Sequence, residues 1–549
     1  PFSEVFIMPK KILSLFLALV AAISLCACGG SSEDILILPI ESDPICLDPQ
    51  VADSKEAKLM IANCFEGLVR LDKDYKIIPG VAESWEISKD GLTYTFKLRK
   101  DTHWKLLNSF EDVLPEGYKD TYRTQVIAAD FVYGISRALD PATQAGDAEK
   151  LFSIKNASAV NSGKQPTSAL GISAQDDSTL VITLERADPD FLRILTLPVA
   201  MPCHEEFFKA THAKYCLDLK YTFCNGPFYL SRWAEDNTLS MYKNDEYKGN
   251  VKVSPDELYF YVNTEEASVV KKIRQRTYDC AFLSEAAKNE LSDNDKLSNY
   301  STENTIYGLC FNCSDSVLSD EDMRRALAMV TKTSELTANS DNAFTKGIVP
   351  DCVRYGENSY REAAGNVSGI AYNEQQALTL WKKGLKKLDI TTAEVVITCA
   401  EENAPLMQQT IQNWQRVFST SILAKVEVKT AEQISTMIYN TSYQVLYHKI
   451  TTDSSTVTDT LKKFTSDSSS NIFGFADKNY DKTVNSIIST YSGAAKLNGC
   501  VNAEKYILDK AVFLPMLGGS SYAVVNKGVD GLYFAPAFES VCMISGGHS

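Results

Sequence analysis

Histidine is scarce in this sequence, with five residues among 549. His204 and His212 lie in one segment and the other three are isolated, so we expect surface or core histidines and no metal site. The sequence also lacks a G-x-S-x-G elbow, an H-E-x-x-H motif, a P-loop and a G-x-G-x-x-G fingerprint. Each of these motifs marks a common nucleophile, zinc or nucleotide site. Their absence favours a binding function over catalysis, without a cofactor.

Basic blocks are missing too, and the formal net charge is −15 at pH 7. Proteins that bind nucleic acid or anionic membrane surfaces concentrate Lys and Arg on one face, so the charge argues against both partners. A cationic or zwitterionic ligand is compatible with it, and so is a merely soluble acidic surface. The length predicts three to four domains.

Long apolar runs are absent except near the amino terminus, at residues 12–25. Two lysines precede this run, as in a secretory signal peptide, and a membrane-spanning helix needs more, ~20 residues. Leu25-Cys26-Ala27-Cys28 then resembles the lipobox of bacterial lipoproteins, in which the last cysteine carries the lipid. We expect a signal peptide at 1–28, a flexible tether at 29–34 and a diacylglyceryl anchor on Cys28.

Twelve cysteines lie beyond this lipobox, and their spacing does not define a disulfide connectivity. Cys310 and Cys313 form the one closely spaced pair. They lie on or beside a predicted strand at 306–311. We therefore interpret them as ordinary strand residues, not as a redox or metal pair.

The most informative stretch runs from Asn63 to Trp104. Apolar and polar residues alternate over 92–99, which is the period of a half-buried strand. Asp90-Gly91 just before it is typical of a hairpin turn, and residues 85–87 supply the first strand. The pattern predicts a β-hairpin.

The same stretch resembles a family signature. Its parts follow one another as Phe65-Glu66-Gly67-Leu68, Pro79 to Trp85, Thr93 to Arg99 and Ala128 to Tyr133. In this order they are similar to the family 5 extracellular solute-binding proteins, the oligopeptide- and dipeptide-binding proteins of ABC importers. The resemblance continues to the final segment and spans nearly the whole mature chain.

The resemblance implies an α/β, two-lobed periplasmic-binding-protein-like fold of class II type, with an additional domain inserted in the first lobe. We predict lobe I from residues 35–65, 191–303 and 518–549, the additional domain II from 66–190, and lobe III from 304–517. In such proteins the ligand lies in the cleft between the lobes, which close by a hinge motion.

The implied function is capture of oligopeptides outside the cytoplasmic membrane and delivery to the permease subunits of an ABC transporter, by a lipid-anchored monomer. The cleft of such proteins pairs with the peptide backbone as an added strand. Binding of a nickel chelate, haem, an oligosaccharide or a signalling peptide on the same fold is the alternative. A lipid-anchored hydrolase is the rival from another class, and the missing motifs disfavour it.

The segment Tyr447 to Asp453 falls where the family has the residues that contact the peptide. The resemblance implies that Asp453 pairs with the α-ammonium group of the ligand, and that Lys449, Ile450 and Thr451 run beside its backbone. An ordinary loop carboxylate is the alternative for Asp453, because several neighbouring residues differ from the family pattern.

Two further pairs of residues are candidates for ligand contact. Asp53 and Ser54 lie in the loop that lines the cleft in the family, although Asp53 to Glu56 also has the form of a helix capping box. Asn225 and Gly226 belong to an Asn-Gly-Pro-Phe block that the family shares.

The sequence departs from the family at two places. Residues 105–125 replace a short turn, and we predict a solvent-facing insertion whose deletion changes stability and peptide affinity little. Arg276-Thr277 replace a Gly-Glu pair, which leaves the backbone geometry there open.

Overall fold

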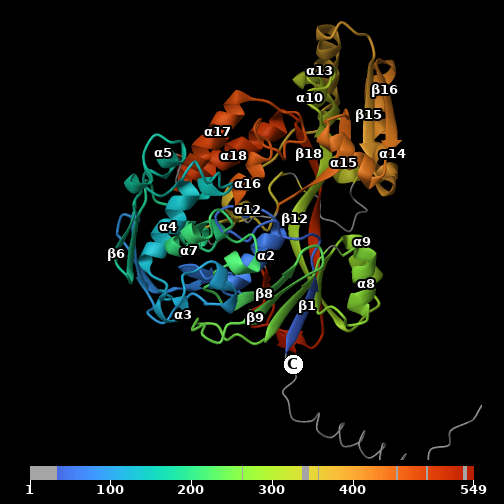
Figure 1. Ribbon diagram of the computed structural model, residues 1–549. Coiled ribbons are helices and arrows are strands. Elements are labelled where there is room, and N and C mark those ends of the chain that lie inside the picture. Colours follow the sequence, from blue (N-terminus) through green and yellow to red (C-terminus); the bar gives the residue numbers. More distant parts are fainter. Residues whose placement is uncertain are drawn as a thin grey trace, which may run out of the picture.

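The computed structural model describes residues 34–548, apart from 189, 263, 337–344, 346, 357, 366, 453–455, 490–492 and 536–540. Figure 1 shows a lower and an upper lobe joined by two long strands, β12 (Leu297–Phe311) and β18 (Phe513–Asn526). The two-lobed fold with mixed helix and sheet is the one predicted. Within the described ranges, no helix has the length and apolar character needed to cross a membrane.

The lower lobe contains two four-stranded sheets. The first has the order β1-β10-β9-β8 and consists of β1 (Ile35–Pro39), β8 (Phe228–Ala234), β9 (Thr238–Lys243) and β10 (Glu257–Tyr261). The second has the order β4-β5-β7-β6 and consists of β4 (Ala82–Ile87), β5 (Thr93–Leu98), β6 (Ile172–Asp176) and β7 (Thr179–Thr183). One hydrophobic core joins both sheets.

Helices and a hairpin surround these sheets. They are α2 (Lys55–Cys64), β2 (Val69–Leu71), β3 (Ile77–Pro79), α3 (Tyr118–Thr121), α4 (Ala128–Leu139), α5 (Ala157–Asn161), α6 (Phe191–Ile194), α7 (Glu205–Ala210), α8 (Glu266–Arg274) and α9 (Glu285–Glu290). The β4–β5 hairpin is the predicted one. Tyr94, Phe96 and Leu98 are buried, and Gly91 in the turn has the positive φ of 71° that glycine adopts readily.

The upper lobe is built on the far end of a six-stranded sheet of order β11-β18-β12-β17-β15-β16. Its remaining strands are β11 (Cys280–Leu283), β15 (Ala393–Cys399), β16 (Ile422–Val428) and β17 (Val445–Thr451). Side chains alternate between the two faces of a strand, so β12 and β17 supply apolar residues to a separate hydrophobic core on each face.

The helices of the upper lobe cover both faces. They are α10 (Glu321–Met329), α11 (Thr333–Leu336), α12 (Tyr360–Ala364), α13 (Glu374–Lys387), α14 (Ala404–Phe418), α15 (Ala431–Tyr439), α16 (Val457–Lys462), α17 (Lys478–Ser489) and α18 (Gly493–Asp509). Three short two-stranded sheets complete the fold, β13 (Arg354–Tyr355) with β14 (Asn358–Ser359), β19 (Val529–Asp530) with β22 (Gly547–His548), and β20 (Tyr533–Phe534) with β21 (Val541–Cys542).

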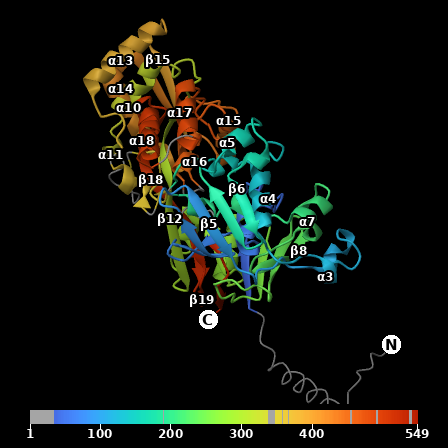
Figure 2. The ribbon, with the colours of Figure 1, turned by 90° about the vertical axis from the view of Figure 1, so that its left-hand side faces the viewer.

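The two long strands form the connection between the lobes, as both views show (Figures 1 and 2). The lower half of β18 pairs with β11, and the upper half of β12 pairs with β17. Their own pairing shifts register between Thr302 and Thr305 and again between Tyr307 and Gly308. Gly518 and Gly519 lie opposite this irregular part. Bulges and glycines weaken and bend a strand, so the sheet can flex at this level.

The insertion at 105–125 is not a solvent-facing loop, and that prediction is wrong. Phe110 is fully buried and Tyr118 is 5% exposed. The Phe110 ring lies 5.0 Å from that of Phe207 and 5.4 Å from that of Phe223. An insertion can be buried when its own apolar side chains fill a gap in the core, and here it extends the core of the lower lobe.

The insertion also pairs with a buried carboxylate in the first turn of α4. Ile127, at the N-cap of α4, makes no side-chain capping bond, but its N–H donates to Asp130 at 3.0 Å. Arg123 from the insertion binds the same carboxylate at 2.7 Å, and the Trp104 indole donates to it at 3.1 Å. The buried charge of Asp130 is therefore paired.

Arg276 has a φ of 59°, so the left-handed backbone conformation is present without a glycine. A non-glycine residue pays roughly 1–2 kcal/mol for this conformation.

The predicted character of Cys310 and His204 is confirmed. Cys310 is a buried residue of β12, and His204 is a core residue whose ring stacks on Tyr122 at 5.1 Å.

Candidate ligand-binding cleft

Two cavities lie beside the boundary between the lobes. The first, which we call the seam cavity, has a volume of about 50 Å³ and lies between the β4–β7 unit and the upper lobe. Its lining includes Glu149, Asp188 and Asp190 from below and Arg354, Tyr355 and Thr456 from above. The second, the lower cavity, has a volume of about 90 Å³ and is lined by Ala62, Arg70, Tyr75, Tyr533 and Cys542 among others.

Tyr75 of the lower cavity and Arg354 of the seam cavity influence each other electrostatically. Burial raises the pKa of Tyr75, and the Arg354 guanidinium lies close enough to lower that pKa in part. Tyr75 lines the lower cavity and Arg354 lines the seam cavity. The seam cavity has walls from both lobes, whereas the lining of the lower cavity comes from the lower lobe alone. We call the two cavities together the candidate cleft.

The edge of β17 lies at the same cleft. β17 pairs with β12 from Val445 to Thr451, but β15 reaches only Val445 and Leu446 on the other side. The isolated bridge between Arg354 and Thr456 ties the chain beyond β17 to the seam cavity. Residues 447–451 thus form a sheet edge that no described strand covers.

The direction of the main chain along this edge follows from two hydrogen bonds. The Asn312 N–H donates to the Gln444 carbonyl at 2.9 Å, and the Thr452 N–H donates to the Asn304 carbonyl at 2.9 Å. The N–H and C=O groups of the even-numbered residues of β17 therefore point toward β12. Because main-chain direction alternates along an antiparallel strand, Lys449 and Thr451 point their N–H and C=O groups at the uncovered side.

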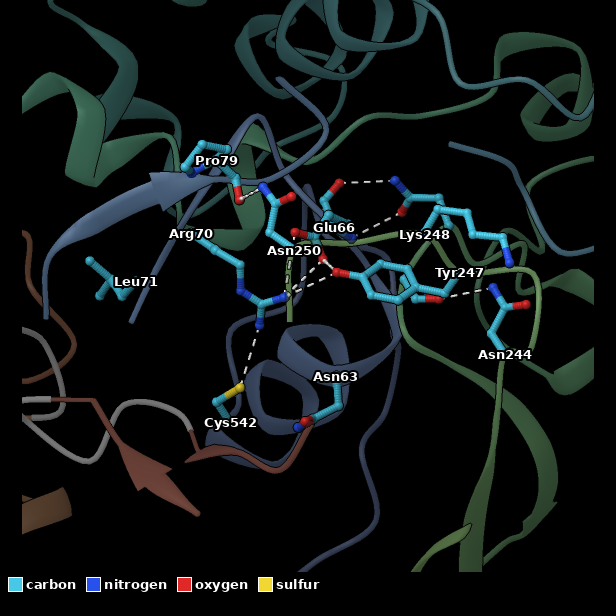
Figure 3. A network of polar contacts seen from close by, with 12 residues as sticks. Asn63, Glu66, Arg70, Leu71, Pro79, Asn244, Tyr247, Lys248, Asn250 and Cys542 are labelled. Atoms are coloured by element: carbon cyan, nitrogen blue, oxygen red, sulfur yellow. Dashed lines mark hydrogen bonds and ion pairs between the residues drawn. The ribbon is translucent and has the colours of Figure 1, made fainter. Parts of the chain in front are cut away.

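A buried charge network supports the floor of the lower cavity (Figure 3). Arg70 donates to Glu66 at 3.1 Å and to the Tyr247 hydroxyl at 3.3 Å. Tyr247 in turn donates to Glu66 at 2.6 Å, and Arg70 also reaches the Cys542 sulfur at 3.4 Å. The two charges neutralise each other, so the network positions the Phe65–Leu71 segment and leaves no isolated charge in the floor.

The seam cavity is lined by ionisable groups whose pKa values are shifted. Burial raises the pKa of Asp190, and the neighbouring Asp188 adds to the shift. Burial also raises the pKa of Glu149, against the opposing effect of Lys462. Burial works against the charge of Lys150, but carboxylates around it outweigh this effect and raise its pKa. The cavity is a polar environment with charges of both signs.

Lys449, Ile450 and Thr451, which we predict to run beside the peptide backbone, lie on β17. Lys449 is exposed, and Ile450 is buried in the upper core. The hydroxyl of Thr451 lies 3.0 Å from that of Thr305 across the sheet. The main-chain groups of these residues point alternately toward β12 and toward the uncovered edge. Asp453 lies outside the described residues.

The other candidates have local structural roles. Ser54 is the N-cap of α2, its hydroxyl accepting from the Ala57 N–H at 3.1 Å, and Asp53 is exposed beside it. The Asn225 amide oxygen accepts from the Glu66 N–H at 3.1 Å, and its amide nitrogen donates to the Glu66 carbonyl at 2.9 Å. A Cβ on Gly226 would lie 2.6 Å from the carbonyl carbon of Cys64.

Sequence reasoning did not find Tyr75, Asp190, Arg354 and Tyr355, which line the cleft. They come from three separate segments, and none belongs to a motif of the sequence. Their meeting depends on the packing of the lobes alone. Across the described part of the chain, no cluster of three or more His, Cys, Asp or Glu side chains could hold a metal ion.

Two lobes enclose a candidate cleft and are joined by a pair of strands that can flex. This arrangement is typical of two-lobed ligand-binding proteins. The chain belongs to the bacterial extracellular solute-binding proteins, family 5, whose model matches residues 76–471. This membership confirms the prediction of a solute-binding protein and not an enzyme.

Similar proteins come from several bacteria. The dipeptide-binding protein DppE of Bacillus subtilis is 26% identical over 514 residues, 92% of this chain and 90% of its own. A dipeptide-binding protein of Lactococcus lactis is 25% identical, over 95% of this chain and 96% of its own. The structure of Listeria monocytogenes OppA bound to peptide has a TM-score of 0.71 at 23% identity, covering 94% of this chain and 100% of that one. This last likeness concerns the fold.

Proposed function

We propose that this protein captures oligopeptides in the interlobe cleft and delivers them to the permease of an ABC importer. The observation that carries the proposal is the edge of β17 at residues 447–451, which pairs with no described strand on the side away from β12. An extended peptide can add to such an edge as a strand. Main-chain pairing of this kind holds peptides of many sequences. The names of the relatives support the same class of ligand.

We also propose that residues 304–517 move as lobe III against lobe I and domain II, with the predicted boundaries. The separate hydrophobic cores of the upper lobe and the flexible level of β12 and β18 support this division. A monomeric carrier suffices for such a motion, because both walls of the cleft come from one chain.

The α-ammonium group of the peptide is expected to bind Asp453. A desolvated ammonium needs an ionised partner, and a charge-assisted hydrogen bond contributes about 1.5–3 kcal/mol. Asp453→Asn keeps the shape and removes the charge, so the peptide affinity should fall roughly 10- to 150-fold. N-acetylated peptides should bind the unaltered protein worse by a similar factor, and should lose little more on the variant. Titration calorimetry on the four combinations measures this.

Two results would contradict these proposals in different ways. Equal binding of free and acetylated peptides to the unaltered protein would place the ammonium site elsewhere. An absence of binding to any peptide would remove the peptide function itself. Native mass spectrometry of the purified protein would then show whether a nickel chelate, haem or an oligosaccharide accompanies it.

We further propose that Cys28 carries a diacylglyceryl anchor that holds the protein on the outer face of the cytoplasmic membrane. Its thioether sulfur would be the attachment atom, so Cys28→Ala should yield an unprocessed precursor without lipid. Cys26→Ala is the matched control and should be processed as before. Intact-mass measurement decides the question, and an identical lipid adduct on the Cys28 variant would exclude this site.

A further inference from the structure

The unit that carries the β4–β7 sheet touches the upper lobe along a row of polar groups, which we call the seam. From below the seam contains Glu149, Lys150, Arg186, Asp188 and Asp190, and from above Gly356, Asp459, Lys462, Ile488 and Lys496. In Figure 1 the helices α16 and α17 lie next to α4 and α5 at this place. The seam lies apart from β12 and β18, so the described residues of the two lobes also meet at a second place.

Three ion pairs cross the seam. Lys462 Nζ lies 2.6 Å from Glu149 Oε1, and Lys150 Nζ lies 3.1 Å from Asp459 Oδ2. Lys496 Nζ lies 3.6 Å from Asp188 Oδ1. The exposed fractions of these six side chains range from 5% for Asp188 to 35% for Lys462. Such pairs are screened less by solvent than fully exposed ones.

Two hydrogen bonds to main-chain groups add to the ion pairs. The Arg186 guanidinium donates to the Ile488 carbonyl at 2.6 Å, and the Gly356 N–H donates to the Asp190 carboxylate at 2.8 Å. Gly356 directly follows Arg354 and Tyr355, which line the cleft. The seam therefore binds the loop that contributes Arg354 and Tyr355 to the cleft.

The hydrophobic cores of the two lobes remain separate at this contact. Among the described residues, the hydrophobic core of the lower lobe and the cores of the upper lobe have no member in common. The seam cavity of about 50 Å³ lies here, and the buried Ser153 hydroxyl that lines it has no hydrogen-bond partner among the described residues. A polar cavity of this size accommodates water. Water can replace the partners of a polar contact, so this contact can separate without exposing a core.

We propose that the seam is a closure latch, which holds the upper lobe against the β4–β7 unit in the ligand-free protein. It raises the population of the closed protein and so raises the affinity for any ligand that needs closure. The latch rests on the two-lobed fold. Only its effect on peptide affinity rests on the proposed function.

The test removes two seam charges from the upper lobe, with Lys462→Met and Lys496→Met combined. Small-angle X-ray scattering on the ligand-free protein measures the radius of gyration, which should increase in the variant. Lys482→Met is the matched control, because Lys482 is exposed on the neighbouring α17 and makes no ion pair with any described residue. Peptide affinity should fall by about tenfold in the double variant, as expected for two half-buried pairs, and not at all in the control.

Ionic strength provides an independent measurement on the same proteins. Raising the salt concentration from about 0.05 M to about 0.5 M shortens the screening length severalfold. The radius of gyration of the unaltered protein should increase with salt, and that of the double variant should change less. Thermal unfolding of each variant confirms that it remains folded.

A pairwise test keeps the proposal falsifiable if the double variant is unstable. Glu149→Gln and Lys462→Met should each open the ligand-free protein, and together they should open it little further, because both remove one pair. Unchanged scattering in these variants and with salt would overturn the latch, whatever the ligand. Changed scattering with no binding of any peptide would retain the latch and refute the peptide function.

Discussion

Replacing Glu504 with alanine is expected to lower the free energy of unfolding by about 3–5 kcal/mol. The Glu504 carboxylate is 0% exposed. It accepts hydrogen bonds from Arg361 at 2.5 Å, from the Tyr360 hydroxyl at 3.0 Å and from the Ile348 N–H at 2.9 Å. Alanine leaves the Arg361 charge and three neutral donors, the Tyr360 hydroxyl and the Ile348 and Val349 N–H groups, without this partner. Urea unfolding at constant pH measures the loss.

The same variant is expected to weaken ligand binding. Glu504 on α18 ties down the segment between Ile348 and Arg361, and this segment carries Arg354 and Tyr355 to the cleft. Asp509→Ala on the same helix is the control, because its pair with Lys505 is exposed and contributes little. A loss below about 1 kcal/mol for the Glu504 variant would mean that Arg361 turns to solvent and that the network is dispensable.

Phe110→Ala is expected to lower the free energy of unfolding by about 3–5 kcal/mol, the usual cost of emptying a buried phenylalanine site. Its ring is 0% exposed and packs on the rings of Phe207 and Phe223. Deleting the whole insertion should cost more, because Arg123 then no longer neutralises the buried Asp130. Thermal or urea unfolding measures both changes.

Lys119→Ala is the matched control for the insertion. Lys119 is exposed in the same segment, so its loss should change stability by less than about 0.5 kcal/mol. The affinity of the folded Phe110 variant for peptide should remain unchanged, since the insertion lines neither cavity. Unchanged stability of the Phe110 variant would show that the aromatic contacts can rearrange around the gap.

The candidate site was predictable only along β17. The resemblance to the family placed Lys449, Ile450 and Thr451 beside the ligand, and the strand there has an edge at the cleft. The same resemblance placed Asn225 near the ligand, but its amide is engaged with the main chain of Glu66. A shared motif identifies a position in the fold. It does not separate residues that hold the cleft together from residues that line it.

The sequence by itself determined the elements whose signals are local. The hairpin around Gly91 follows from an alternating pattern and a turn within a few residues, and the helix after Ser54 follows from its cap and apolar stripe. Only the tertiary structure decided that Phe110 is buried, although its segment looks like a surface loop. It also decided that Asp190 meets Gly356, 166 positions away. Contacts between distant segments depend on how whole lobes pack, and no pattern within one segment encodes that packing.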